Sequence, residues 1–360
     1  MSRISIILLL FAVLWNNLGF CYTTADVEIS TPVNDVISGS EEQESSVFSK
    51  EKINKAIENI EEISSTAENS NRKGILPVED IEKMYNAMNA NFEDIIEMLA
   101  NPNNAYEFLQ AKGLDRIMIT NIETPYTPLR NTILNLLKIL FDVAPSTADA
   151  VMPARMIDKV LDIFVTDDDL TVKENVVDIL DIWLPENPRV QARVMKIKGL
   201  VPFYEQISKL EVRGVRTLLN LFNKILKEHL DVRYKKPQKS KRDGEELKLY
   251  QRIGLIEHMS RKEVCNGLLE IFRFTWHSEP ENELSVLILD LSTKVAPFCL
   301  NAFKGKLEAE ELFDNFLKYL KEQDRQEYLA KFGMNASDIE TIVTNYLDSL
   351  KQVSEMKDEF

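Results

Sequence analysis

The sequence predicts an all-α protein, a solenoid of stacked helical units with helical caps at both ends. The main observation is a repeat of 43 residues that runs without a gap through three copies. The paired residues at the start of the copies are Asn101-Pro102, Ala144-Pro145 and Asn187-Pro188. Apolar positions keep the same step, as at Leu140, Trp183 and Leu226. Units of roughly 40 to 47 residues are typical of armadillo and HEAT arrays, so we expect about four armadillo-like repeats over 101–280.

The first copy indicates how each unit divides into three helices. Asn101 before a proline predicts the start of a short helix, because a capping side chain precedes a residue whose missing N–H is harmless there. This helix is expected to end at Gly113. Residues 114–122 predict a second short helix, and a Thr-Pro turn leads to a long third helix over 129–142.

The third helix of each copy is amphipathic, with an apolar stripe at spacings of three and four and a polar stripe opposite it. Third helices line the concave surface of armadillo stacks, so we expect the polar stripes to face a partner. The candidate partner-binding residues are Asn131, Asn135, Lys138, Glu174, Asp178, Asp181, Asn220, Lys224 and Lys227. Their mixed charges favour control of orientation and association rate over bulk affinity.

Segments outside the three clear copies complete the expected organisation. After copy three the next Gly-Leu pair comes 12 residues late, which indicates a basic loop inserted at 231–246. Residues 76–100 predict an N-terminal capping helix, and residues 281–356 predict C-terminal capping helices. The acidic stretch 22–75 alternates Glu with Ser, Thr and Asn. We expect it to be a disordered leader that allows one transient amphipathic helix.

Both ends of the chain carry sequences typical of the secretory pathway. Residues 1–21 combine Arg3, an apolar run too short to span a bilayer and a small-residue cleavage context, which predicts a signal peptide. The last four residues, a variant of the Lys-Asp-Glu-Leu retrieval signal, are Lys357, Asp358, Glu359 and Phe360. We therefore expect a protein of the endoplasmic reticulum lumen that a retrieval receptor recognises. Asn335 begins an Asn-Ala-Ser sequon and is the expected glycosylation site.

Composition and cysteine usage fit this compartment. The formal charge of −15 disfavours nucleic acid as a partner, and we expect a monomer without membrane insertion. Two cysteines, Cys265 and Cys299, remain once residues 1–21 are removed. In an oxidising lumen they form either one intrachain disulfide or two buried free thiols.

The sequence predicts no catalysis, metal or cofactor. His229, His258 and His277 are isolated from carboxylates and cysteines at metal-ligand spacing, and the cysteines lack Cys-x-x-Cys spacing. The 11 glycines include neither a phosphate-binding loop nor a nucleophile elbow. We therefore expect a binding protein.

These features together resemble one known family. A signal peptide, an acidic leader, armadillo-like units that open on Gly-Leu and a retrieval tail are similar to those of the Sil family of nucleotide exchange factors, also called BiP-associated proteins. The resemblance covers roughly residues 81–302. Copy two departs from the pattern because Met156 stands where the others have glycine, and the tail ends in Phe.

The resemblance implies a function that needs no catalytic residue. Members of the family embrace one lobe of the nucleotide-binding domain of the luminal heat-shock chaperone BiP with the concave face, and they favour an open ADP cleft. It therefore implies promotion of ADP release, in support of protein folding and translocation. The alternative is a luminal armadillo scaffold or cargo adaptor with no effect on nucleotide. Release of a fluorescent ADP analogue from BiP separates the two.

Overall fold

The computed structural model describes residues 41–74, 76–234, 241–278, 283–322 and 324–351. All regular structure in these ranges is helical, which confirms the all-α class. The contacts divide the chain between Glu44 and Ser45, and all described residues except 41–44 belong to the unit Ser45–Phe360. The expected signal peptide and retrieval tail lie outside the described ranges.

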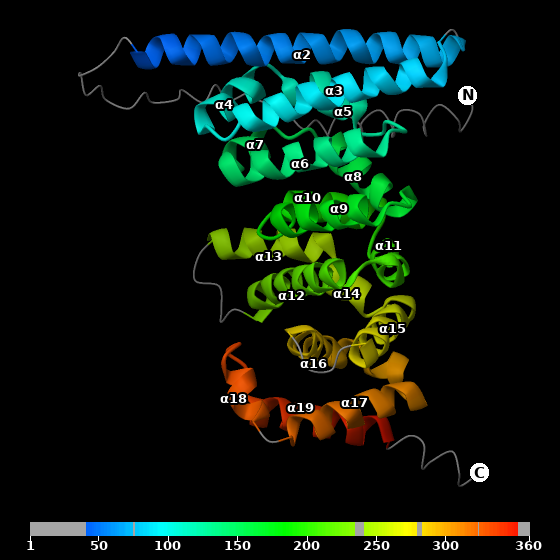
Figure 1. The fold of residues 1–360 in the computed structure, drawn as a ribbon. Coiled ribbons are helices and arrows are strands. Elements are labelled where there is room, and N and C mark those ends of the chain that lie inside the picture. Colours follow the sequence, from blue (N-terminus) through cyan, green and yellow to red (C-terminus); the bar gives the residue numbers. More distant parts are fainter. Residues whose placement is uncertain (1–40, 75, 235–240, 279–282, 323, 352–360) are drawn as a thin grey trace, which may run out of the picture. The chain divides into compact units, whose positions relative to one another are not determined.

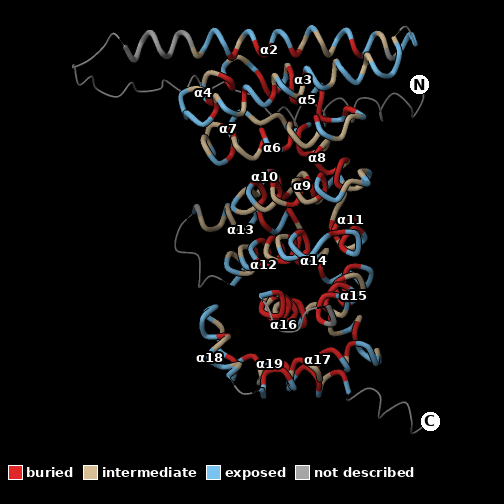
Figure 2. Tube along the Cα trace, viewed as in Figure 1, coloured by how far each residue is buried: buried red, intermediate tan, exposed pale blue. Residues whose placement is uncertain are grey.

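The longest helix, α2 (Glu41–Lys73), occupies much of the stretch for which the composition predicts a disordered leader. That prediction is wrong for 41–73. Ile53, Ile57 and Ile60 are at most 1% exposed and belong to the core of the fold. Figure 2 shows the opposite side of α2 exposed. The helix is ordered because one apolar stripe at helical spacing has a surface to pack against, whereas Lys55, Glu58 and Glu62 on other sides of the helix stay exposed.

The next helices match the predicted first unit. After α3 (Val78–Met98), the helix expected at 76–100, they are α4 (Pro102–Gln110), the π-helical turn η1 (Leu114–Met118), α5 (Ile119–Asn121) and α6 (Thr127–Val143). The side chain of Asn101 accepts a hydrogen bond of 3.0 Å from the backbone N–H of Asn103. The cap predicted for the first helix is therefore present.

Copies two and three follow the same order. Copy two contains α7 (Pro145–Val151), α8 (Ala154–Thr166) and α9 (Leu170–Trp183). Copy three contains α10 (Pro188–Ile197), α11 (Val201–Gln206), the 3-10 turn η2 (Ile207–Lys209) and α12 (Val212–Tyr234). Asn187 caps α10 by accepting a hydrogen bond of 3.3 Å from the N–H of Val190.

The end of α4 differs from the prediction in the residue that turns the chain. Lys112 takes the left-handed conformation, with φ of 59°, whereas Gly113 has φ of −54°. A Cβ atom on Gly113 would lie 2.3 Å from the ring of Phe108. Glycine is thus required at position 113 for close packing. In copy three the equivalent glycine, Gly199, itself has the left-handed conformation, with φ of 64°.

The C-terminal part contains α13 (Lys241–Ile253), α14 (Leu255–Met259), α15 (Lys262–Ser278), α16 (Glu283–Phe303), α17 (Leu307–Leu320), α18 (Arg325–Ala330) and α19 (Ala336–Lys351). The basic loop is shorter than predicted, because α12 continues to Tyr234 and α13 begins at Lys241. Residues 235–240 lie outside the described ranges. Asp324, between α17 and α18, has φ of 72°.

The long helices contact one another in chain order. The contacts join α3 to α6, α6 to α9, α9 to α12, α12 to α16 and α16 to α19 (Figure 1). Leu140, Trp183 and Leu226 are at most 4% exposed, so the repeat predicted their burial correctly. In the described part of the chain, α16 alone is long and apolar enough to cross a membrane, and 50% of that segment is buried inside the fold.

Candidate functional site

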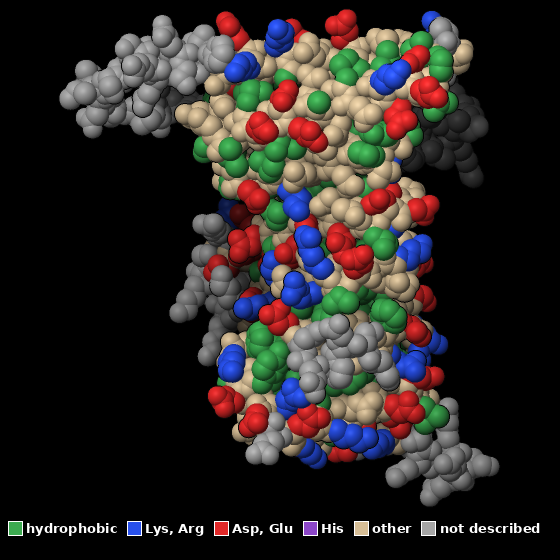
Figure 3. Space-filling view, in the orientation of Figure 1, with side chains coloured by type: hydrophobic (Ala, Val, Ile, Leu, Met, Phe, Trp, Pro, Cys, Tyr) green, Lys and Arg blue, Asp and Glu red, His purple; other side chains and the backbone are tan. Residues whose placement is uncertain are grey.

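The nine candidate partner-binding residues lie on three helices that contact one another in succession, α6, α9 and α12. We call this set the polar stripe. Asn135, Lys224 and Lys227 are exposed, and the other six are half-buried. Figure 3 shows Lys or Arg and Asp or Glu side chains intermingled on the face that it presents. The stripe itself contains three lysines and three carboxylates and is a surface of mixed charge.

Hydrogen bonds and an ion pair join α6 to α9 across the stripe. The Nζ atom of Lys138 lies 2.8 Å from Oδ2 of Asp178 and 3.5 Å from Oδ1 of Asn175. The Nδ2 atom of Asn175 in turn donates to Oδ1 of Asn131 at 3.1 Å. These contacts fix one helix against the next because each needs both helices in register.

The junction between α9 and α12 is built in the same way. Asp178 also binds Arg213, with 2.6 Å between Oδ2 and Nη2. Asp181 accepts hydrogen bonds from Nζ of Lys224 at 2.8 Å and from Nδ2 of Asn220 at 3.3 Å. Asp178 thus lies between two cations, one from each neighbouring helix.

Most charges of the stripe are therefore neutralised within the protein, although the sequence pattern predicts polar stripes that face a partner. Asn175 and Arg213 belong to the network and were not among the predicted residues. One signal was available, because opposite charges about one repeat apart face each other on successive third helices. Lys138 and Asp178 are separated by 40 residues, and Asp181 and Lys224 by 43.

Three cations at equivalent positions of the repeat, Arg130, Lys173 and Arg216, hold the segments around the third helices. Lys173 is only 2% exposed, and its Nζ atom donates to the carbonyl oxygen of Phe164 at 2.7 Å and to Oε1 of Gln206 at 3.0 Å. Burial lowers the pKa of Lys173, and the positive charge of Lys209 lowers it further. A buried lysine of this kind often marks catalysis, but here both contacts tie structural elements together.

The other two cations bind carboxylates. Nε of Arg130 lies 2.8 Å from Oδ2 of Asp167, and its Nη1 atom donates to the carbonyl oxygen of Thr124 at 2.6 Å. Nη1 of Arg216 lies 3.1 Å from Glu283. Because Thr124 precedes α6 and Asp167 precedes α9, Arg130 connects the starts of two successive third helices.

The recesses of the described surface are open or small. One open recess of about 450 Å³ lies beside Arg130, and its lining includes five acidic residues, Glu123, Asp162, Asp167, Asp168 and Asp169. An apolar cavity of about 30 Å³ lies between α10, α12 and α14. Among the described residues, no group of three or more His, Cys, Asp or Glu side chains is arranged to hold a metal ion.

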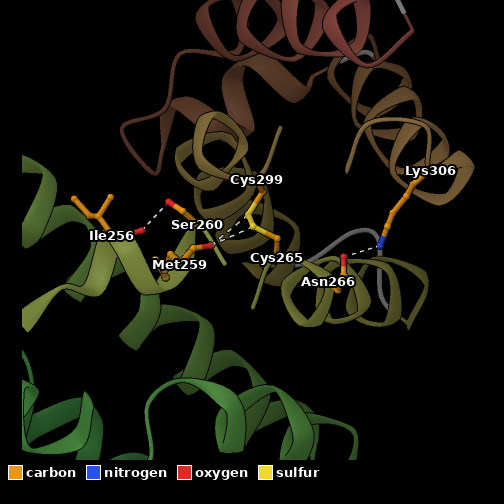
Figure 4. The surroundings of a disulfide bond; sticks show 7 residues. All are labelled: Ile256, Met259, Ser260, Cys265, Asn266, Cys299 and Lys306. Carbon is orange, nitrogen blue, oxygen red and sulfur yellow. Dashed lines mark hydrogen bonds between the residues drawn. A yellow bond between two sulfur atoms is a disulfide. The ribbon is translucent and has the colours of Figure 1, made fainter. Parts of the chain in front are cut away.

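Cys265 and Cys299, for which the sequence allows either a disulfide or two free thiols, form a disulfide that joins α15 to α16 (Figure 4). The Cα atoms of Cys265 and Cys299 are 5.4 Å apart, and both residues are fully buried. The carbonyl oxygen of Met259 lies 3.1 Å from Sγ of Cys265 and 3.6 Å from Sγ of Cys299. The disulfide therefore sits where α14 meets α15 and α16.

Two further predicted positions are placed by the structure. His229 is 3% exposed, its Nε2 atom lies 2.9 Å from Oε1 of Gln191, and its ring meets that of Tyr250 edge-on at 4.8 Å. Burial lowers the pKa of His229 to about 4, against a smaller opposing effect of Glu257. It is a core histidine with a partner. Asn335 is exposed just before α19, as a glycosylation acceptor requires.

No model of a known protein family and no curated protein matches the chain. Its function is therefore argued from its own residues, from their contacts and from the features of the sequence.

Proposed function

We propose that this protein is an armadillo-like nucleotide exchange factor that binds the nucleotide-binding domain of BiP through its polar stripe and promotes ADP release. The observation that carries the proposal is the succession of α6, α9 and α12, which contact one another and share one cross-linked polar surface. A continuous surface over three helices suits a protein partner better than a small molecule.

The proposed compartment is the endoplasmic reticulum lumen. The disulfide between Cys265 and Cys299 supports a site in the secretory pathway, because structural disulfides persist in oxidising compartments and are rare in the cytosol. The sequences at 1–21 and 357–360 support the same assignment.

The contacts across the stripe support a stiff scaffold. A factor that opens the ADP cleft of a chaperone must hold one lobe in a new orientation, and a deformable surface would bend instead. Asp178 bridges Lys138 and Arg213, so α6, α9 and α12 are joined through one carboxylate. The mixed charges that remain exposed orient the partner and raise the association rate.

The mechanism is a coupling of two binding equilibria, and no residue of the factor contacts nucleotide. A factor that binds the open chaperone about 100-fold more tightly than the ADP-bound form weakens ADP binding by the same factor, about 2.7 kcal/mol. By the same linkage, saturating ADP must weaken the complex between factor and chaperone to an equal extent.

The deciding experiment follows release of a fluorescent ADP analogue from purified BiP with and without this protein. We expect faster release with wild type and slower release with Lys227→Glu, which reverses an exposed charge of the stripe. Lys196→Glu, which reverses an exposed charge on α10, is the matched control and should behave as wild type. Binding to BiP without faster ADP release would leave a scaffold or adaptor as the function, and absence of binding would reject BiP as the partner.

A further inference from the structure

Glu174 differs from the other carboxylates that α9 contributes to the polar stripe. Asp178 is paired with Lys138 and Arg213, and Asp181 is paired with Lys224. Glu174 forms no ion pair within the described residues, and its Oε1 atom is buried without a hydrogen-bond partner. Burying a carboxylate oxygen in this way costs free energy that the fold itself does not return.

Two cations on α9 and α12 that could pair with Glu174 are engaged elsewhere. Lys173 is turned toward the carbonyl oxygen of Phe164, and Arg213 on α12 binds Asp178. The negative charge of Glu174 is therefore uncompensated at the surface between α9 and α12.

A glycine on the neighbouring helix makes room for this carboxylate. A Cβ atom on Gly214, in the first turns of α12, would lie 3.3 Å from Cγ and 3.4 Å from Oε1 of Glu174. A contact of 3.3 Å would require the side chain of Glu174 to shift by a few tenths of an ångström. Glycine at this position thus leaves the side chain of Glu174 where it lies.

We propose that Glu174 is the anchor of the polar stripe for a lysine or arginine side chain of a bound partner protein. The inference rests on the proposed function, under which that partner is the nucleotide-binding domain of the chaperone. A cation is the occupant that fits, because the position offers a half-buried, unpaired carboxylate beside charges that are already neutralised. Desolvation on binding would strengthen the new ion pair relative to one in water.

The first experiment measures binding to nucleotide-free BiP by calorimetry at two salt concentrations. Glu174→Gln keeps the shape of the side chain and removes its charge. We expect about 10- to 100-fold weaker binding and a smaller dependence on salt. Glu205→Gln, which removes an exposed charge from α11, is the matched control and should bind as wild type. Equal affinity of wild type and Glu174→Gln would overturn the proposal.

A stability measurement separates an anchor from a structural residue. If Glu174 is kept for binding, Glu174→Gln should unfold at the same temperature as wild type or a higher one, since it removes an unpaired charge from a half-buried position. A variant that loses stability and affinity together would make Glu174 structural and reject the anchor.

A second arm does not depend on BiP. A tetra-arginine peptide is titrated into protein labelled with ¹³C at the glutamate carboxyl groups, and the resonance that disappears in Glu174→Gln is assigned to Glu174. We expect that resonance to shift on addition of peptide, and an unchanged resonance would overturn the anchor. If wild type does not bind BiP at all, the proposed function fails and this arm still decides whether Glu174 binds a cationic side chain.

Discussion

Lys138 on α6 and Asp178 on α9 form an ion pair of 2.8 Å that joins two successive third helices. Both side chains are mostly buried, at 22% and 16% exposed. A double-mutant cycle with Lys138→Met and Asp178→Asn should therefore give a coupling free energy of about 1 kcal/mol in urea unfolding. The exposed pair Lys241 and Glu245, at 3.9 Å, is the control and should give a coupling close to zero.

This pairing changes what a charge reversal on the stripe does. Asp178→Lys places a third positive charge beside Lys138 and Arg213, so it should lower stability as well as partner affinity. A cycle with no coupling would show that this ion pair does not hold α6 against α9. Binding tests of the stripe are therefore best made at the exposed Lys227.

Trp183 tests the apolar part of the repeat. Its ring lies 5.3 Å from that of Phe141, its indole N–H donates to Asp149 at 3.0 Å, and the residue is 4% exposed. Trp183→Ala should lower the free energy of unfolding by about 3 to 5 kcal/mol. Trp183→Phe keeps an aromatic ring in place and should cost less. A loss below about 1 kcal/mol for the alanine variant would contradict this packing.

The fold could be predicted where the sequence is periodic. The third helices and the burial of Leu140, Trp183 and Leu226 follow from apolar spacing and a fixed repeat, both of which are local properties. The docking of α2 could not be predicted, because Ile53 and Ile57 become buried only when distant helices supply a surface. Composition shows that the segment is polar and acidic, but it does not show that other helices offer a surface for its isoleucines.

The candidate site was predicted as a set of positions but not as a network. Helical spacing places Lys138, Asp178 and Lys224 on one side of their helices. It does not show that a lysine meets an aspartate of the next unit, which depends on the register between helices. For the same reason the isolation of Glu174 and its contact with Gly214 appear only in three dimensions.

The disulfide gives a prediction about stability. Cys265 and Cys299 are 34 residues apart. In the entropic model, closing a loop of this length raises the free energy of the unfolded state by about 4 kcal/mol. A Cys265→Ala, Cys299→Ala variant should lose stability of this order in guanidinium unfolding. Wild type whose disulfide has been reduced with excess dithiothreitol should show a similar loss of stability. Equal stability of the oxidised and reduced proteins would mean that packing of α15 against α16 suffices.

His229 predicts a loss of stability in acid. Its pKa is about 4 in the fold and about 6.5 in an unfolded chain, so the unfolded state binds more protons between these values. Stability should therefore be fully present above about pH 6.5 and fall as the pH is lowered toward 4, by at most about 3 kcal/mol. His229→Gln, which cannot titrate, should lack this part of the pH dependence. A His229 resonance that titrates in wild type with a midpoint near 6.5 would contradict the burial.

The last prediction concerns α2, whose order the composition did not suggest. Ile57 is fully buried, whereas Lys55 on the same helix is exposed. Ile57→Asp should release α2, because burying an unpaired carboxylate costs more than the docking of one marginal helix supplies. Hydrogen exchange should then show loss of protection in α2 while α9 stays protected.

Lys55→Asp introduces the same residue on the exposed side and should leave α2 protected. The contact of α2 with the rest of the fold also includes the ion pair of Glu61 with Arg116 and the hydrogen bond of 2.7 Å from Ser64 to Asn121. Arg116→Met should therefore raise exchange in α2 by less than Ile57→Asp does, since a half-exposed ion pair contributes about 1 kcal/mol or less. If the amides of α2 in wild type exchange as fast as those of an unfolded chain, the segment is a disordered leader after all. Ile57 then does not dock α2 on the fold.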